Sequence, residues 1–174
     1  METKSIVKAE SIGNDLILFR VFNAPRALVF KVWTTKKHLE QWWGPHFIKK
    51  SKIEIDLRKG GAYRWTMCGP DGTEYPMKGI FTELLQNEKI TYTCNLDEHN
   101  KEWHDQLKQN IKNKSASLNC IVTVMFEEQS EKTKVSIITR FESEEVRDSF
   151  AKMGMIQGWT ESMEKVEVEL NKIK

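Results

Sequence analysis

The sequence of 174 residues has no long hydrophobic run and no block of one charge. No apolar stretch approaches the roughly 20 residues that span a bilayer, and residues 1–5 lack the apolar core of a signal peptide. The 27 lysines and arginines nearly balance the 25 aspartates and glutamates, and no basic cluster alternates with aromatic residues. This argues against nucleic-acid binding. We therefore expect a cytoplasmic protein with no membrane span.

Cysteine is scarce, with only Cys68, Cys94 and Cys120, and these three have no metal-like spacing. Because the cytoplasm keeps thiols reduced, we expect small core residues. If the segments around Cys94 and Cys120 pair as adjacent antiparallel strands, however, the two thiols lie nearly opposite each other. A disulfide between them therefore stays open as an alternative.

Motifs that carry catalysis are also missing. The histidines His38, His46, His99 and His104 form no His-Glu-x-x-His motif. The sequence contains no Gly-x-Ser-x-Gly elbow, phosphate loop or dinucleotide fingerprint. We therefore predict no catalytic residue, no cofactor and no metal.

The charged stretch 97–115 allows more than one interpretation. Trp103, Leu107 and Ile111 are spaced four apart, which predicts one stripe of a short surface helix or lid, with a solvated, flexible insertion as the alternative. The acidic and histidine residues of the stretch are Asp97, Glu98, His99, Glu102, His104 and Asp105. A divalent-ion site is one hypothesis for them, but chelation needs fixed geometry, so a solvated charged loop is favoured.

Among the patterns that are present, the N-terminal third predicts a strand followed by two short helices. Residues 14–22 are apolar and β-prone, and Pro25 suits the first turn of a helix. Apolar residues then recur at helical spacing, with one interruption, as far as Trp42-Trp43-Gly44-Pro45. Gly44 suits the left-handed residue that closes a helix, and Pro45 cannot continue one.

The rest of the chain predicts a sheet and a long helix. Alternating apolar residues and turn signals predict six strands, over 53–57, 63–67, 75–85, 89–95, 118–127 and 134–141. Residues 143–174 predict one long helix with Ser143 as its N-cap. The predicted fold class is α+β: a curved antiparallel sheet wrapped around a long C-terminal helix, as a single domain 1–174 with a charged insertion at about 97–115.

Two glycines within the predicted helix, Gly154 and Gly158, each cost about 1 kcal/mol relative to alanine. Close packing of the helix backbone would explain them. Alternatively, the missing side chains leave space for a ligand between helix and sheet. The sequence alone does not separate these two explanations.

Large adaptable side chains on the predicted strands and helix suit the lining of such a cavity, although many plain cores have the same composition. We interpret Trp42 as a structural cap and Trp43 as a pocket residue. The candidate ligand-binding residues are Trp43, Tyr63, Trp65, Met67, Met77, Tyr92, Met155, Gly158 and Trp159. Arg64, Lys78 and Arg140 alternate with apolar strand residues and are expected to face solvent, with an anchor inside a pocket as the alternative.

Several ordered motifs together resemble one known group. They are Arg20-x-Phe22-x-Ala24-Pro25, Val32-Trp33-Thr34, His38-Leu39-x-x-Trp42-Trp43-Gly44-Pro45, Ile55-Asp56-Leu57-Arg58-x-Gly60-Gly61, Gly69-Pro70-Asp71-Gly72-Thr73-Glu74-Tyr75-Pro76, Val122-Thr123-Val124-x-Phe126 and Gly158-Trp159. The chain is similar to the SRPBCC (START-like, helix-grip) superfamily. Within it, the resemblance is to the family of homologues of the activator of the ninety-kilodalton heat-shock chaperone ATPase.

The resemblance implies an internal cavity that in related proteins binds lipids, hormones or other hydrophobic molecules. The resemblance also implies, loosely, which positions line this cavity. They are the strand and helix residues that face the space between sheet and helix, here Trp65, Met77, Tyr92, Met155 and Trp159. We therefore predict a non-enzymatic binding protein for a small hydrophobic or lipid-like ligand, as a monomer or homodimer. The alternatives are a chaperone-binding module and an enzyme of cyclase or hydrolase type.

Overall fold

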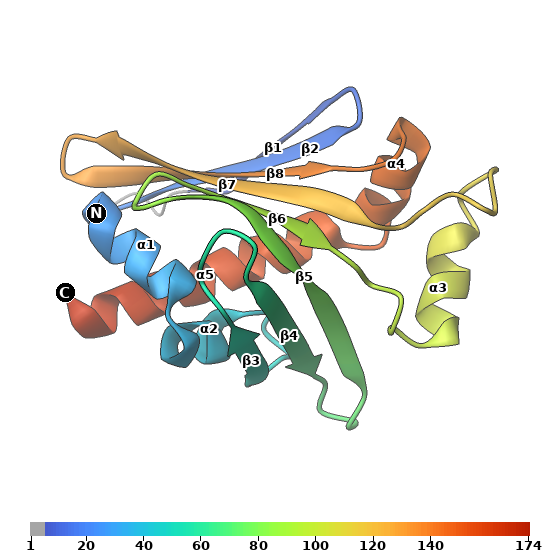
Figure 1. The fold of residues 1–174 in the computed structure, drawn as a ribbon, viewed down its shortest axis with the longest axis horizontal. Coiled ribbons are helices and arrows are strands. Elements are labelled where there is room, and N and C mark those ends of the chain that lie inside the picture. Colours follow the sequence, from blue (N-terminus) through green and yellow to red (C-terminus); the bar gives the residue numbers. More distant parts are fainter. Residues whose placement is uncertain (1–5) are drawn as a thin grey trace.

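In the computed structural model, which describes residues 6–174, an eight-stranded antiparallel sheet curves around a C-terminal helix (Figure 1). The strand order in the sheet is β1-β2-β8-β7-β6-β5-β4-β3. The strands are β1 (Lys8–Ile12), β2 (Asp15–Phe22), β3 (Ser51–Ile55), β4 (Ala62–Cys68), β5 (Glu74–Leu85), β6 (Lys89–Cys94), β7 (Cys120–Gln129) and β8 (Lys132–Arg140). The helix-grip fold predicted from the sequence is confirmed.

The helices cover the concave face and the ends of this sheet (Figure 1). They are α1 (Arg26–Thr34), α2 (Lys36–Trp42), α3 (Lys101–Lys108), α4 (Glu144–Lys152) and α5 (Met155–Ile173). No helix of the described residues is both long enough and apolar enough to cross a membrane. The expectation about a leader at residues 1–5 lies outside the part of the chain that the structure describes.

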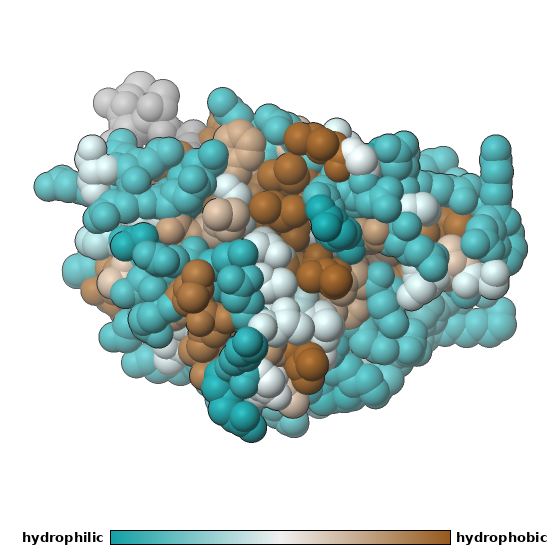
Figure 2. All heavy atoms as spheres, turned by 45° about the horizontal axis from the view of Figure 1, so that its top comes forward, coloured by the Kyte–Doolittle hydropathy of each residue, from teal (hydrophilic) through white to brown (hydrophobic). Residues whose placement is uncertain are grey.

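Strand side chains alternate between the core and the outer surface. In β2, every second residue from Leu16 to Phe22 is buried, and the neighbours between them are only half-buried. On the outer side, Ile80 and Ile121 are exposed although the next residue of each strand is buried. Figure 2 shows a stripe of apolar surface between polar side chains, on the face turned upward in Figure 1.

The edge strand β1 is a difference from the sequence prediction. All five of its residues are exposed, so it has no buried apolar face and no alternating pattern to detect. A tight turn at Gly13, whose φ is +53°, pairs it with β2 in a hairpin. Pairing rather than burial therefore defines this strand.

The two predicted N-terminal helices are present, and they end as expected. Trp42 is fully buried, and its indole Nε1 donates to the Val32 carbonyl at 3.0 Å, which ties α2 to α1. Gly44 follows with a φ of +108°, the left-handed conformation predicted for it. Trp42 thus has the structural position that its sequence context indicated.

The single long C-terminal helix predicted for residues 143–174 is wrong in one respect, because it is divided in two. Gly154 has a φ of +97° and separates α4 from α5. The left-handed conformation is accessible to glycine at little cost, so Gly154 ends one helix instead of weakening its interior. Ser143 is the N-cap as predicted, and its Oγ accepts from the Val146 amide at 3.2 Å.

The charged insertion contains a folded helix. Leu107 and Ile111 are fully buried, and Trp103 is partly buried against the same core. The Ser149 hydroxyl of α4 donates to the Leu107 carbonyl, and the Lys112 amide donates to Glu145 at 2.6 Å. Of the two interpretations of this stretch, the structure therefore shows the helical one over Lys101–Lys108, whereas Ile111 joins the core from the turn after the helix.

Candidate functional site

A cavity of about 270 Å³ lies between α5, the concave face of the sheet and the charged insertion. Its lining comes from β4 to β8, α3, α4, α5 and the turn after α2. The lining residues are Trp43, Gly44, Pro45, Met67, Met77, Tyr92, Cys94, Leu96, His99, Trp103, Cys120, Val122, Thr139, Phe141, Phe150, Met153, Gly154, Met155, Gly158, Trp159 and Ser162. Most of these side chains are apolar, as in small-molecule pockets generally.

Gly158 leaves part of this space open. A Cβ atom built on Gly158 would meet no heavy atom within 4 Å beyond its own helix backbone and chain neighbours. Close packing therefore does not explain this glycine, and of the two explanations from the sequence only the cavity applies to it. Gly154 also has open space around it, but its backbone conformation already accounts for it.

Most residues that the sequence singled out meet at this cavity. Trp43 from the end of α2 and Trp159 from α5 contact each other edge to face, with ring centroids 5.4 Å apart. Met67, Met77, Tyr92, Met155 and Gly158 line the same space. Tyr63 and Trp65 do not line it. They lie behind the wall, where Trp65 packs on Trp43 with ring centroids 4.6 Å apart.

The charged insertion and the α4–α5 junction supply lining that the sequence prediction missed. The rings of His99 and Trp103 contact each other at a tilt of 60°, with centroids 4.2 Å apart. Trp103 also contacts Phe150 of α4 edge to face, with ring centroids 6.0 Å apart. Leu96 and Met153 complete this end. The spacing of Trp103, Leu107 and Ile111 indicated a buried face, but only the fold shows which core that face joins.

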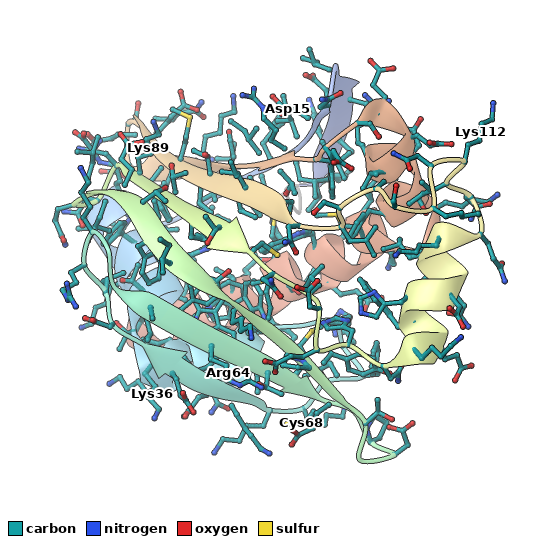
Figure 3. The ribbon with its side chains drawn as sticks, turned by 45° about the vertical axis from the view of Figure 1, so that its right-hand side comes forward. Asp15, Lys36, Arg64, Cys68, Lys89 and Lys112 are labelled. Atoms are coloured by element: carbon teal, nitrogen blue, oxygen red, sulfur yellow. The ribbon has the colours of Figure 1, made fainter. Side chains whose placement is uncertain are left out.

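Charged side chains near the site point away from the cavity. Arg64 of β4, labelled in Figure 3, and Lys78 of β5 both bond Glu98, at 2.5 and 2.6 Å. These hydrogen bonds lower the pKa of Glu98 to about 2. Arg140 bonds Asp15 at 2.8 Å. All three basic residues thus face solvent as expected, and Glu98 attaches the insertion to the sheet.

Histidine and acidic side chains do not converge on a cation site in the described residues. Within residues 6–174, no group of three or more His, Cys, Asp or Glu side chains has an arrangement that could hold a metal ion. In the charged stretch, Glu98 pairs with Arg64 and Lys78, and Asp105 pairs with Lys101. Glu98 and Asp105 are thus engaged in ion pairs along the surface.

Two polar residues of the cavity wall are buried and neutral. Burial raises the pKa of Tyr92 well above its usual range, with smaller contributions from Cys94 and Cys120. Burial also lowers the pKa of His99 to about 4; His104 adds to this effect and the Pro76 backbone opposes it. At neutral pH, the cavity wall therefore contains a neutral phenol and an uncharged imidazole.

The two cavity cysteines are directly opposite each other, as their spacing predicted. Cys94 of β6 pairs with Cys120 of β7 in the register of the sheet, and both are free thiols. Contact with the Cys120 thiol, together with burial, raises the pKa of Cys94. The raised pKa keeps Cys94 a neutral thiol at the cavity wall.

Comparison with solved structures identifies relatives of the same fold. A protein from Arthrobacter aurescens is 26% identical, with a TM-score of 0.78 over 96% of this chain and 92% of that chain. A protein from Mycobacterium smegmatis shares the fold at 19% identity, with a TM-score of 0.76 over 98% of this chain and 100% of that chain. A protein from Nitrosomonas europaea does so at 23% identity, with a TM-score of 0.73 over 92% of this chain and 96% of that chain. No matching relative was found among curated proteins.

The sequence itself matches a family model over most of its length. Residues 23–171 match the model described as "Activator of Hsp90 ATPase homolog 1-like protein". This span runs from the end of β2 to within α5 and so includes nearly all of the cavity-lining elements. The chain therefore belongs to the family of activator of Hsp90 ATPase homolog 1-like proteins.

Proposed function

We propose that this chain is a cytoplasmic, non-enzymatic binding protein that holds a small hydrophobic molecule between α5 and the sheet. The observation that carries the proposal is the cavity of about 270 Å³ at Gly158, where a side chain would fit without a clash. A glycine within a helix costs about 1 kcal/mol relative to alanine. Retaining one where alanine would fit is consistent with space kept for a ligand.

The lining supports an apolar ligand. Trp43, Trp159, Trp103 and Phe150 offer large aromatic surfaces, and Met67, Met77 and Met155 offer flexible thioethers that adapt to ligand shape. The volume lies just below the roughly 300–1,000 Å³ of typical small-molecule pockets. One compact molecule, and not a long acyl chain, suits this space.

An enzymatic role is a weaker proposal. Besides the Cys94 thiol, the cavity groups with shifted pKa values are Tyr92 and His99, but burial disfavours the charged form of each. Proton transfer between them would create the charges that burial opposes. Binding of an intact ligand leaves these two residues uncharged, whereas catalysis by proton transfer would not.

Interaction with a chaperone is the second candidate, because the family description names an ATPase activator. The apolar stripe of Figure 2 is the kind of surface that a partner protein covers. Ligand binding ranks first because most elements of the fold contribute to the apolar lining of the cavity, which a surface interaction does not need. Stimulation of the chaperone ATPase by the purified protein would favour this second candidate.

The proposed function is tested with N-phenyl-1-naphthylamine, an uncharged dye whose fluorescence rises in apolar surroundings. We expect saturable binding by the native protein, with transfer of excitation from Trp43 and Trp159 in the wall. Gly158→Leu places a side chain in the cavity and is expected to lower dye affinity at least tenfold. Val168→Leu, on an exposed part of α5, is the matched control.

The outcomes separate cavity binding from surface binding. Loss of binding in Gly158→Leu, with native circular dichroism and unchanged binding in Val168→Leu, supports the proposal. Equal dye affinity in the native protein and Gly158→Leu would show that the dye lies elsewhere and would refute it.

A further inference from the structure

Two side chains of the cavity wall carry polar atoms that the protein leaves unsatisfied. Tyr92 is 1% exposed and its hydroxyl has no hydrogen-bond partner among the described residues. His99 is 8% exposed, and its ring nitrogens have no partner of normal hydrogen-bond geometry there, although the Pro76 carbonyl lies near enough to raise its pKa slightly. Such buried groups are rare in native proteins and each costs about 1–3 kcal/mol. A ligand atom that bonds them would recover this cost.

A neighbouring tyrosine shows that this is not a general property of the core. Tyr63 contacts Tyr92 with ring centroids 5.2 Å apart, yet its hydroxyl donates to the Thr93 carbonyl at 2.5 Å. Tyr63 does not line the cavity, whereas Tyr92 does. The unpartnered hydroxyl thus belongs to the tyrosine that lines the cavity.

The wall also determines the charge that a ligand can carry. None of the lining residues is Asp, Glu, Lys or Arg. A carboxylate or ammonium buried here would have no opposite charge to compensate its desolvation, which is expensive. An uncharged tyrosine hydroxyl can donate and accept, and a neutral imidazole has one donor and one acceptor nitrogen. These groups match a hydroxyl or carbonyl group.

We propose that the cavity selects an uncharged, mainly apolar molecule with one hydroxyl or carbonyl group, which hydrogen-bonds to Tyr92 and His99. This inference rests on the proposed function and adds the chemical class of the ligand. Free fatty acids and other carboxylates are then poor ligands, because the charge and not the apolar body is rejected.

Three probes that share one ring system test this selection: 2-naphthol, naphthalene and 2-naphthoate. Affinities are measured at pH 7 by quenching of tryptophan fluorescence and by calorimetry. We expect 2-naphthol to bind about three- to tenfold more tightly than naphthalene, as one net hydrogen bond predicts. We expect 2-naphthoate, ionised at this pH, to bind at least about a hundredfold more weakly than 2-naphthol.

Ring-preserving variants assign the preference to residues. Tyr92→Phe and His99→Phe each lower the ratio of naphthol to naphthalene affinity, and the double variant brings it to about one. Tyr63→Phe is the matched control and leaves the ratio unchanged. Because the Tyr92 hydroxyl has no partner, Tyr92→Phe without ligand is expected to melt no lower than the native protein. A reduced preference then does not reflect damage to the fold.

The results distinguish this inference from the proposed function. Equal binding of naphthol and naphthalene, or tight binding of naphthoate, overturns the ligand class while the dye result for Gly158→Leu still stands. An unchanged ratio in the double variant also overturns it. Failure of all three probes together with the dye overturns both.

Discussion

Single residues at the cavity have conformations and surroundings that predict their effects on stability. Trp42 and Trp43 are adjacent in sequence, but Trp42 bonds the Val32 carbonyl within the helix pair and Trp43 faces the cavity. Neighbouring residues of the same type thus have different tasks. The two side chains separate at the helix end, because Trp42 is the last residue of α2 and Trp43 has an extended backbone, with φ −64° and ψ 113°.

Gly158→Ala is expected to raise the free energy of unfolding by about 1 kcal/mol. The added Cβ meets open space, and alanine loses less backbone entropy in a helix than glycine. Urea denaturation followed by circular dichroism measures the change. Gly154→Ala is the contrasting variant, because a φ of +97° strains any residue with a Cβ, and it is expected to destabilise the protein. A destabilised Gly158→Ala would show that this position is closely packed.

His99 is expected to make the protein less stable as the pH falls from about 6.5 to 4. Its pKa is about 4 in the folded protein, against 6.5 as the ordinary value, so the unfolded chain binds the proton more readily in this interval. The contribution to the free energy of unfolding is constant above this window. It falls through the window by about 2–3 kcal/mol.

His99→Phe keeps an aromatic ring beside Trp103 and removes the titrating group. Urea denaturation at pH 4, 5, 6 and 7 is expected to show a weaker loss of stability in the variant than in the native protein. Parallel losses in the two proteins would contradict a neutral, buried His99.

At the scale of elements, the sequence predicted the parts whose burial follows a simple period. The six strands after Pro45 and the helix end at Gly44 were predictable because apolar alternation and glycine chemistry act locally. The edge strand β1 has no buried face, and nothing in its five residues marks it as a strand. The sequence pattern predicts Gly154 inside a helix. Its left-handed conformation depends instead on how α4 and α5 pack, which the local pattern does not contain.

The site was predictable to a similar extent. Alternation correctly placed Tyr63, Trp65, Met67 and Tyr92 toward the core, but it does not separate residues that line a cavity from residues behind them. His99 lies in a highly charged segment, and such a segment predicts that its side chains are exposed to solvent. Its burial includes a tertiary contact with Tyr75 of β5, whose ring centroid lies 5.7 Å away, and a local pattern does not contain such a contact.

Lys165 of α5 fixes the turn that follows α2, and its loss is expected to destabilise this connection. Its Nζ donates to the Gly44 and Ile48 carbonyls at 3.0 and 2.9 Å. Lys165→Met keeps an unbranched side chain but leaves both carbonyls without this donor, so we expect the free energy of unfolding to fall by about 1–2 kcal/mol. Lys174→Met, at the exposed end of the chain, is the control.

The same lysine gives a test in alkaline solution. Burial, with a contribution from Lys49, lowers the pKa of Lys165 to about 8 from its ordinary 10.5. The unfolded chain therefore binds more protons between these values, and stability from this group rises as the pH increases from 8 to 10.5. Lys165→Met is expected to lack this rise. An identical pH profile for variant and native protein would contradict the assignment.

For the whole molecule, the cavity depends on nearly every part of the fold at once. Strands β4 to β8, three helices and the turn after α2 all contribute lining, and the buried residues around it form one hydrophobic cluster. Unfolding of the sheet or removal of α5 would therefore abolish the site. The proposed ligand binding would therefore be coupled to the stability of the entire sheet and helix assembly, not to one loop.

Ligand binding is accordingly expected to stabilise the protein as a unit. At a free 2-naphthol concentration one hundred times its dissociation constant, the free energy of unfolding should rise by about 2.7 kcal/mol, because only the folded chain has the cavity. Urea denaturation followed separately by tryptophan fluorescence and circular dichroism should show the same shift in midpoint with both probes. Gly158→Leu, which fills the cavity, should show no shift at the same naphthol concentration. A shift of equal size in that variant would place the binding site outside the cavity, since linkage then acts through a surface that the leucine does not alter.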